Sequence, residues 1–109
     1  MKVFKFGGAS VKDAAGVKNI LRVLRKTGFE DTLIVVSAMG KTTNALEQMV
    51  HSFFENKEQF PKDLEKVRED HNHIIEDLFE FESRATKQKV NTLFERVLTF
   101  LKDTKSNDY

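Results

Sequence analysis

The chain has 109 residues, the length of one small domain, and its 18 basic and 17 acidic side chains leave a net charge of +1. This balance does not favour nucleic acid or an anionic membrane as a partner, and the lack of cysteine excludes disulfides and thiolate metal sites. The sequence shows no signal segment and no apolar run long enough to span a membrane, so we expect a cytoplasmic protein.

The first predicted strand, residues 2–7, ends in a glycine turn. Gly7 and Gly8 precede a helical pattern that begins near Val11. Glycines let backbone N–H groups approach a phosphate closely, and a helix that follows such a turn directs its positive end at the anion. Lys5 lies on the face opposite the neighbouring phenylalanines, because side chains alternate along a strand. These residues alone fit either a phosphate site or a tight turn beside a solvated lysine.

The next predicted helix and strand complete a strand–helix–strand unit. Ser10 and Asp13 have the spacing of a capping box, which starts the helix, and Gly28 ends it. The strand at 32–37 is a continuous apolar and β-branched run, which is typical of a strand covered on both faces of a parallel sheet. A loop of small and hydroxyl side chains follows this strand, so we expect both loops at one edge of a parallel sheet.

This second loop carries hydroxyls at Ser37 and Thr43 and an amide at Asn44. Such groups can accept hydrogen bonds from an ammonium group or donate them to a carboxylate, so they suit an amino-acid ligand. Thr43 or Asn44 can equally cap the helix that follows, with Glu47 as the capping-box partner of Asn44. The residues alone leave both interpretations open.

Helical spacing dominates the rest of the chain. One helix runs from about Leu46 to near Asn56, Pro61 suits the first turn of a third helix, and a break at residues 82–83 precedes a fourth. The last two helices are apolar on one face and charged on the other, so we expect an antiparallel hairpin, followed by a frayed polar tail at 102–109. Their apolar faces comprise Phe60, Leu64, Val67, His71, Ile74, Ile75 and Leu78, and then Val90, Leu93, Phe94, Val97, Leu98 and Leu101.

Two further patterns do not indicate a site. His71 and His73 are two residues apart on a helix and point about 200° apart, so they cannot share a metal ion, and we expect His71 to be packed and His73 exposed. The run from Gly40 to Thr42 looks like the end of a Walker A loop, but Val35 stands where that pattern needs its first glycine. We therefore expect no metal ligands in this chain.

The two loops together resemble the aspartokinase branch of the amino acid kinase family. Residues 5–11 read KFGGASV, where the family usually has K-F-G-G-T-S-V, and residues 35–46 read VVSAMGKTTNAL, where it has V-V-S-A-x-x-G-x-T-N-x-L. The resemblance is strong over residues 1–50 and weak beyond them. Ala9 replaces the usual threonine and so removes a hydroxyl from the first loop.

This resemblance implies part of an α/β amino acid kinase fold, a three-layer arrangement around a parallel sheet. Residues 1–56 would form the phosphoryl and substrate-loop half of a lobe, and residues 57–109 a helical hairpin of the same truncated domain. The implied enzyme is an aspartate kinase, which moves the γ-phosphoryl of ATP, bound with Mg²⁺, to the side-chain carboxylate of L-aspartate. The product, 4-phosphoaspartate, begins the biosynthesis of lysine, threonine and methionine. We expect the chain alone to be inactive.

The resemblance also implies roles for individual residues. Lys5 would be the catalytic residue, since it would stabilise the charge on the transferred phosphoryl group. The residues implied in binding the phosphates of ATP are Lys5, Gly7, Gly8 and Ser10, and those implied in binding aspartate are Ser37, Thr43 and Asn44.

Two predicted strands are too few for a stable parallel sheet. We therefore expect the rest of its own kinase domain to be one partner of this segment, and we expect the isolated chain to form a homo-oligomer by self-association or exchange of elements at its open sheet edge. Two alternative functions remain: a non-catalytic interaction module built on the helical hairpin of residues 57–103, and a regulatory remnant that binds aspartate without phosphorylating it.

Overall fold

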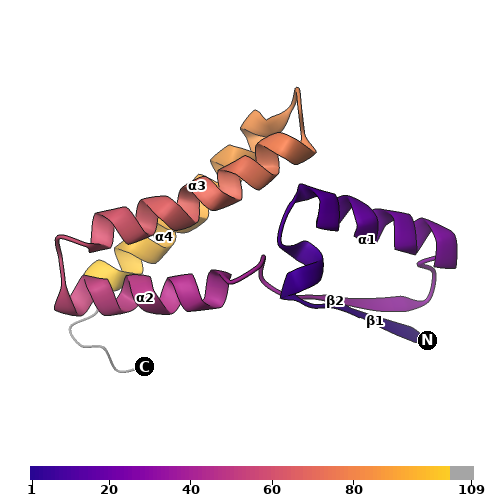
Figure 1. Cartoon of the computed structure of the whole chain (residues 1–109), viewed down its shortest axis with the longest axis horizontal. Coiled ribbons are helices and arrows are strands. Elements are labelled where there is room, and N and C mark those ends of the chain that lie inside the picture. Colours follow the sequence, from indigo (N-terminus) through magenta and orange to yellow (C-terminus); the bar gives the residue numbers. More distant parts are fainter. Residues whose placement is uncertain (104–109) are drawn as a thin grey trace. The chain divides into compact units, whose positions relative to one another are not determined.

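The protein is described by a computed structural model that covers residues 1–103 (Figure 1). Its elements are β1 (Lys2–Phe6), the 3-10 helix η1 (Gly8–Val11), α1 (Ala14–Thr27), β2 (Thr32–Val36), α2 (Thr42–Glu55), α3 (Phe60–Leu78) and α4 (Ser83–Lys102). The chain divides into two compact units, the first ending at Thr42 and the second beginning at Thr43. The α/β class predicted from the sequence is confirmed, and so are its two parallel strands.

The first unit is a strand–helix–strand unit. β1 and β2 pair in parallel, with Lys2 opposite Thr32 and Phe6 opposite Val36. One face of this sheet lies toward α1 (Figure 1). On this side the Lys2 ammonium donates a hydrogen bond to the carbonyl of Thr27, at the end of that helix (3.2 Å). The rings of Phe4 and Phe6 are half-buried on the same face. The opposite face of the sheet is the more exposed one.

The start of α1 differs from the prediction, while its end agrees. Ser10 is not the cap, because it lies inside the η1 turn. The cap is Asp13, whose extended backbone lets its carboxylate accept a hydrogen bond from the Gly16 N–H (2.8 Å). Gly28 ends the helix with a φ of 82°, and its N–H donates to the Leu24 carbonyl (2.8 Å).

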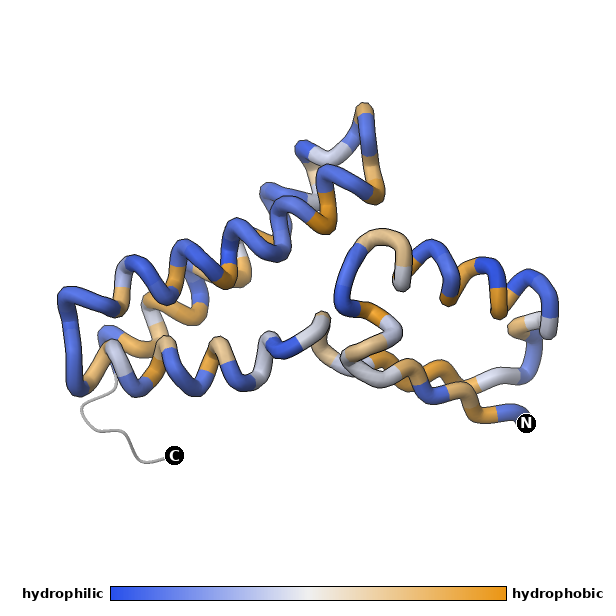
Figure 2. Tube along the Cα trace, in the orientation of Figure 1, coloured by the Kyte–Doolittle hydropathy of each residue, from blue (hydrophilic) through white to orange (hydrophobic). Residues whose placement is uncertain are grey.

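In the second unit, α3 and α4 form the predicted antiparallel hairpin. Arg68 pairs with Glu95 at 3.7 Å, and Lys87 pairs with Glu76, so positions advance along one helix as they recede along the other. Figure 2 shows apolar and polar bands alternating along both helices. The buried apolar side chains of this unit are Met49, Val67, Ile75, Phe94 and Leu101.

The ends of these helices largely follow the sequence. Pro61 lies in the first turn of α3, and the break before Ser83 is present. The predicted frayed tail starts too early, because α4 continues through Lys102, and residues 104–109 of that tail lie outside the described part of the chain. None of the helices in the described part is long and apolar enough to cross a membrane.

A polar cluster joins α2 to α3. The Ser52 side chain is buried and its hydroxyl donates to Asp63, while the Gln59 amide donates to the other carboxylate oxygen of Asp63 (3.0 Å). Gln48 donates in turn to the Ser52 hydroxyl (3.4 Å). The hydrogen bonds from Gln59 and then from Ser52 hold the pKa of Asp63 below its ordinary value. The cluster therefore favours the charged carboxylate in the folded state.

The two histidines of α3 lie as predicted. His71 is half-buried, with its Nδ1 2.8 Å from the Val67 carbonyl oxygen and its ring edge-on to Phe94. His73 is exposed beside Glu76. Neither belongs to a cluster of three potential metal ligands within residues 1–103.

Candidate functional site

The two loops singled out from the sequence begin at the same edge of the sheet. Phe6, the last residue of β1, lies opposite Val36, the last residue of β2. The Ser37 N–H extends this ladder by donating to the Phe6 carbonyl (2.9 Å). Because the strands are parallel, both carboxyl ends meet there, as expected from the sequence.

The loops also touch through their glycines. The Gly40 N–H donates to the Gly8 carbonyl (3.2 Å). A Cβ at Gly8 would lie only 2.8 Å from the Gly40 carbonyl oxygen, and Gly40 itself has a left-handed φ of 57°. Gly8 therefore has a structural reason to be glycine, which is the close approach of the second loop. This contact joins residues far apart in the sequence, and no local pattern indicated it.

Gly7 differs from Gly8 in this respect. Its φ of −75° suits any residue, and a Cβ placed there would meet no atom within 4 Å. The neighbouring Ser10 N–H is already used, because it donates to the Gly7 carbonyl (3.0 Å). Packing within the described residues thus leaves the space above Gly7 open to another group.

Lys5 is exposed on the sheet face opposite the Phe4 and Phe6 rings, as predicted. Among residues 1–103 its ammonium has no hydrogen-bond or ion-pair partner. A second lysine that the sequence did not indicate, Lys12, lies beside the other loop, with its Cβ 3.7 Å from the position of a Cβ on Gly40. One lysine therefore lies just before the first loop, and another lies beside the second loop.

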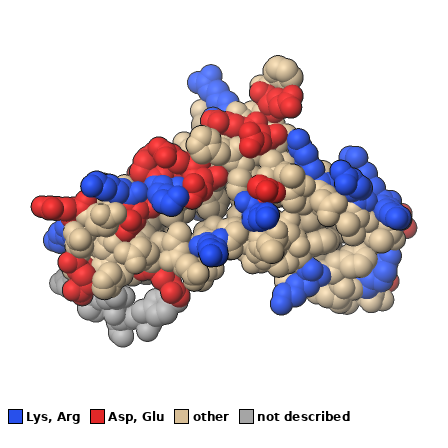
Figure 3. Space-filling view, viewed as in Figure 1, with Lys and Arg blue, Asp and Glu red and all other residues tan. Residues whose placement is uncertain are grey.

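The first unit as a whole is basic. Its 42 residues include eight lysines or arginines and three acidic side chains, a net charge of +5 against +1 for the chain. Figure 3 shows several of these basic side chains along α1. A surface of this sign favours an anionic ligand.

The helix after the glycine turn does not present a free positive end, which corrects the expectation from the sequence. The η1 turn lies between Gly7 and α1, and the first turn of α1 is already capped by the Asp13 carboxylate. A phosphate at this turn would therefore depend on the loop backbone and on lysine, and α1 would not contribute its N-terminus.

The second loop enters α2 earlier than expected. Thr42 begins the helix, and its hydroxyl donates to the Met39 carbonyl. Thr43 and Asn44 are therefore the second and third residues of α2, so the capping role considered for them is wrong. Their side chains are exposed, as is Ser37, which lies in the first unit whereas Thr43 and Asn44 lie in the second. Lys41 stands at the glycine position of the usual second motif.

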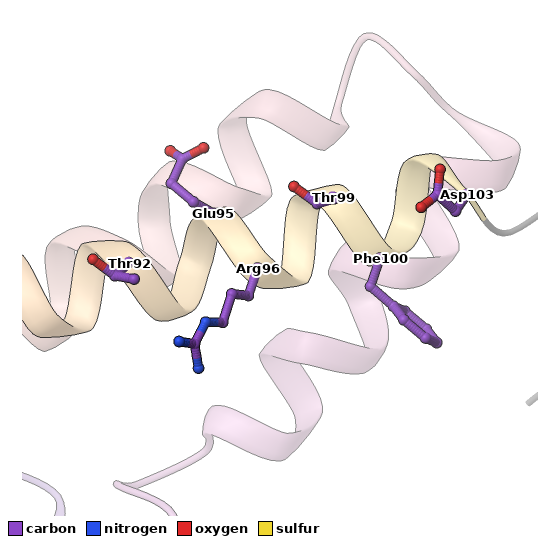
Figure 4. Close-up of a pocket in the computed structure, with 6 residues that line it drawn as sticks. All are labelled: Thr92, Glu95, Arg96, Thr99, Phe100 and Asp103. Carbon is purple, nitrogen blue, oxygen red and sulfur yellow. The ribbon is translucent and has the colours of Figure 1, made fainter.

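A shallow hollow on α4 is a separate feature (Figure 4). Its lining consists of Thr92, Glu95, Arg96, Thr99, Phe100 and Asp103. All of them belong to one helix or directly follow it, so the hollow is a stretch of helix surface, and it includes none of the predicted site residues.

Comparison with known proteins shows what the sequence is similar to. The chain is 30% identical over 84 residues to bifunctional aspartokinase/homoserine dehydrogenase 2 of Arabidopsis thaliana, a match that covers 77% of this chain and 9% of the relative. It is 35% identical over 80 residues to aspartokinase 1 of the same plant (70% and 14%), and 48% identical over 44 residues to its aspartokinase 2 (40% and 8%).

These matches cover only a small part of each relative, at most 14% of its length. No protein-family model matches the chain, and no solved structure matches it. The amino acid kinase fold therefore stays a prediction. In sequence, this chain belongs with the aspartokinases, as a segment related to part of their length.

Proposed function

We propose that this chain supplies the phosphoryl-binding and aspartate-binding loops of an aspartate kinase. The enzyme would transfer the γ-phosphoryl of ATP to the side-chain carboxylate of L-aspartate and release 4-phosphoaspartate and ADP. The observation that carries this proposal is the meeting of the two aspartokinase-like loops at one sheet edge, through the Ser37–Phe6 and Gly40–Gly8 hydrogen bonds. The similarity to aspartokinases supports it.

The first loop would act on the phosphoryl group. Transfer of this kind needs alignment and charge neutralisation more than covalent help from the protein. The free ammonium of Lys5 would donate to oxygens of the transferred group, and the backbone around Gly7 and Gly8 would lie against the phosphates. The open space above Gly7 suits this approach, and the Ser10 hydroxyl would add a further contact.

The second loop would hold aspartate. The hydroxyls of Ser37 and Thr43 can accept hydrogen bonds from the α-ammonium group or donate them to a carboxylate, and the Asn44 amide can do both. Binding would fix the attacking carboxylate oxygen in line with the γ-phosphorus, which raises the rate by orienting the reactants.

Mg²⁺ would arrive with ATP as part of the substrate. We propose no ligand for the ion among the residues of the two loops, and the acid of the first loop, Asp13, caps α1. We therefore assign no step to the metal through this chain. Since the chain spans 14% or less of these relatives, we also propose that it does not turn over alone.

The location of the protein stays a prediction. The sequence favours the cytoplasm, whereas the plant relatives are chloroplastic proteins by name.

The test is an acyl-phosphate assay on the product of the longest reading frame that contains these residues. Mg-ATP is supplied with aspartate, glutamate or acetylglutamate, and hydroxylamine traps the acyl phosphate. Product with aspartate alone is expected, and the 109-residue chain serves as the inactive control. A folded protein that forms no product from any carboxylate would contradict the proposal. Aspartate binding without phosphorylation would then indicate a regulatory remnant, and no binding would favour the helical hairpin as an interaction module.

A further inference from the structure

The outer edge of β2 carries unpaired backbone groups. The ladder between β1 and β2 is bounded by the Lys2 N–H bonding to Asp31 and the Ser37 N–H bonding to Phe6. In a parallel pair, alternate residues of each strand direct both backbone groups at the neighbour. On β2 these are the odd-numbered residues, so Thr32, Ile34 and Val36 direct their N–H and C=O groups away from β1. Within residues 1–103, β2 has no second neighbouring strand.

This edge also lacks the features that usually protect a sheet edge. Natural sheets block exposed edges with lysine, proline, a bulge or a covering element. The sequence from Thr32 to Val36 is Thr-Leu-Ile-Val-Val, without charge or proline, and the β1–β2 register is unbroken. The side chains of Ile34 and Val36 remain 38% and 54% exposed. The outer edge of β2 can therefore form backbone hydrogen bonds with another strand.

The outer edge of β1 is a poorer template. Only Val3 and Lys5 point their backbone groups outward there, and one of the two is a lysine. A second copy of β1 paired about an axis at Lys5 would place the two lysines opposite each other, which is unfavourable across a strand pair. Pairing through β2 avoids this repulsion.

We propose that two copies of this chain join by antiparallel pairing of their β2 strands about a two-fold axis at Ile34. Both backbone groups of Ile34 face outward, so Ile34 would exchange both hydrogen bonds with Ile34 of the second copy. Thr32 would lie opposite Val36 of the second copy, and the two sheets would become one continuous sheet in the order β1-β2-β2-β1. The contact is self-complementary, because each copy offers the same uncharged strand and the same free backbone groups.

Burial of apolar side chains would stabilise the proposed dimer in addition to the backbone hydrogen bonds. On the sheet face away from Phe4, the β2 side chains of Leu33 and Val35 are 51% and 44% exposed. Pairing would extend this apolar face across the axis and bring Leu33 of one copy near Val35 of the other. Removal of such surface from water is favourable.

Variants with like or opposite charges at positions 32 and 36 test the register of the proposed β2–β2 pair. The chain is compared by sedimentation velocity with the double variants Thr32→Lys/Val36→Lys and Thr32→Lys/Val36→Glu, because positions 32 and 36 would face each other across the axis. We expect a dimer for the wild type, a dissociation constant higher by on the order of tenfold for the all-lysine variant, and recovery in the lysine–glutamate variant. The control Val3→Lys adds one positive charge to an exposed position on the other strand, away from the axis, and is expected to leave the dimer intact.

A cross-link tests the axis independently. The chain has no cysteine, and directly paired residues in an antiparallel ladder have Cα atoms about 5.5 Å apart, within the range of a disulfide. Ile34→Cys should give a covalent dimer on mild oxidation, whereas Val3→Cys should not. A monomeric wild type at high concentration, equal association of the two charge variants, or failure of the Ile34→Cys cross-link would each overturn the proposal. None of these outcomes depends on kinase activity.

Discussion

Gly7 and Gly8 are neighbours in the sequence, yet within residues 1–103 only Gly8 has a packing reason to be glycine. A Cβ at Gly8 would collide with the Gly40 carbonyl oxygen at 2.8 Å, whereas a Cβ at Gly7 would meet nothing within 4 Å. The collision involves backbone atoms, so it cannot be relieved by moving a flexible side chain. Gly8 therefore allows the close approach of the two loops, whereas no contact within residues 1–103 requires glycine at position 7.

Alanine substitutions at the two positions test this difference in packing. We expect Gly8→Ala to lower the free energy of unfolding by about 1–3 kcal/mol, because the second loop must move. Gly7→Ala should change the free energy of unfolding little, since its φ of −75° suits alanine. Urea denaturation followed by circular dichroism gives both values. If Gly8→Ala were as stable as the wild type, the close contact between the two loops would contribute little to the free energy of unfolding.

At the scale of single elements, the carboxylate of Asp63 links α2 to α3. Asp63 accepts hydrogen bonds from Gln59 and Ser52, and both lower its pKa in the folded state. Because the pKa of the folded state lies below that of the unfolded chain, the unfolded chain binds more protons at acidic pH. The stabilisation is complete above about pH 4 and is lost as the pH falls through the lowered pKa.

The cluster around Asp63 can be tested by its pH dependence. We expect Asp63→Asn to lower the free energy of unfolding by about 1–2 kcal/mol at pH 6, since hydrogen bonds to a charged group are replaced by weaker ones. The difference from the wild type should shrink toward pH 3. Asp77→Asn, on an exposed part of the same helix, is the control. A deficit that stays constant from pH 6 to pH 3 would mean that the charge of Asp63 does not matter.

The elements themselves were largely predictable, while the way they start was not. The spacing of apolar residues predicted the hairpin of α3 and α4, and the run of β-branched residues predicted β2. Both patterns are visible in the sequence because burial requires apolar side chains at regular positions. Ser10 and Asp13 both have the chemistry of a helix cap, and the choice between them depends on the η1 turn, which the local pattern does not contain. The contact between Gly8 and Gly40 was missed because it needs the register of two strands.

At the scale of the whole molecule, the exposed surface of β2 is the feature that most needs a partner. Leu33, Ile34, Val35 and Val36 are each at least 38% exposed, although their sequence is typical of a covered strand. The sequence predicted this conflict, because two strands cannot cover each other on both faces. A second copy of the chain would satisfy the free edge in the way proposed above, and other strands would satisfy it in the proposed kinase.

The most direct test of the proposed function concerns Lys5. The longest reading frame that contains the chain is prepared as the wild type, as Lys5→Ala and as Lys18→Ala, which removes an exposed lysine from α1. Aspartyl phosphate, trapped with hydroxylamine, is measured at saturating Mg-ATP and aspartate, and circular dichroism checks the fold. Loss of a preorganised donor to the phosphoryl group should lower the rate of Lys5→Ala on the order of a hundredfold or more and leave Lys18→Ala unchanged. Near-normal turnover by Lys5→Ala would contradict the assignment of the first loop.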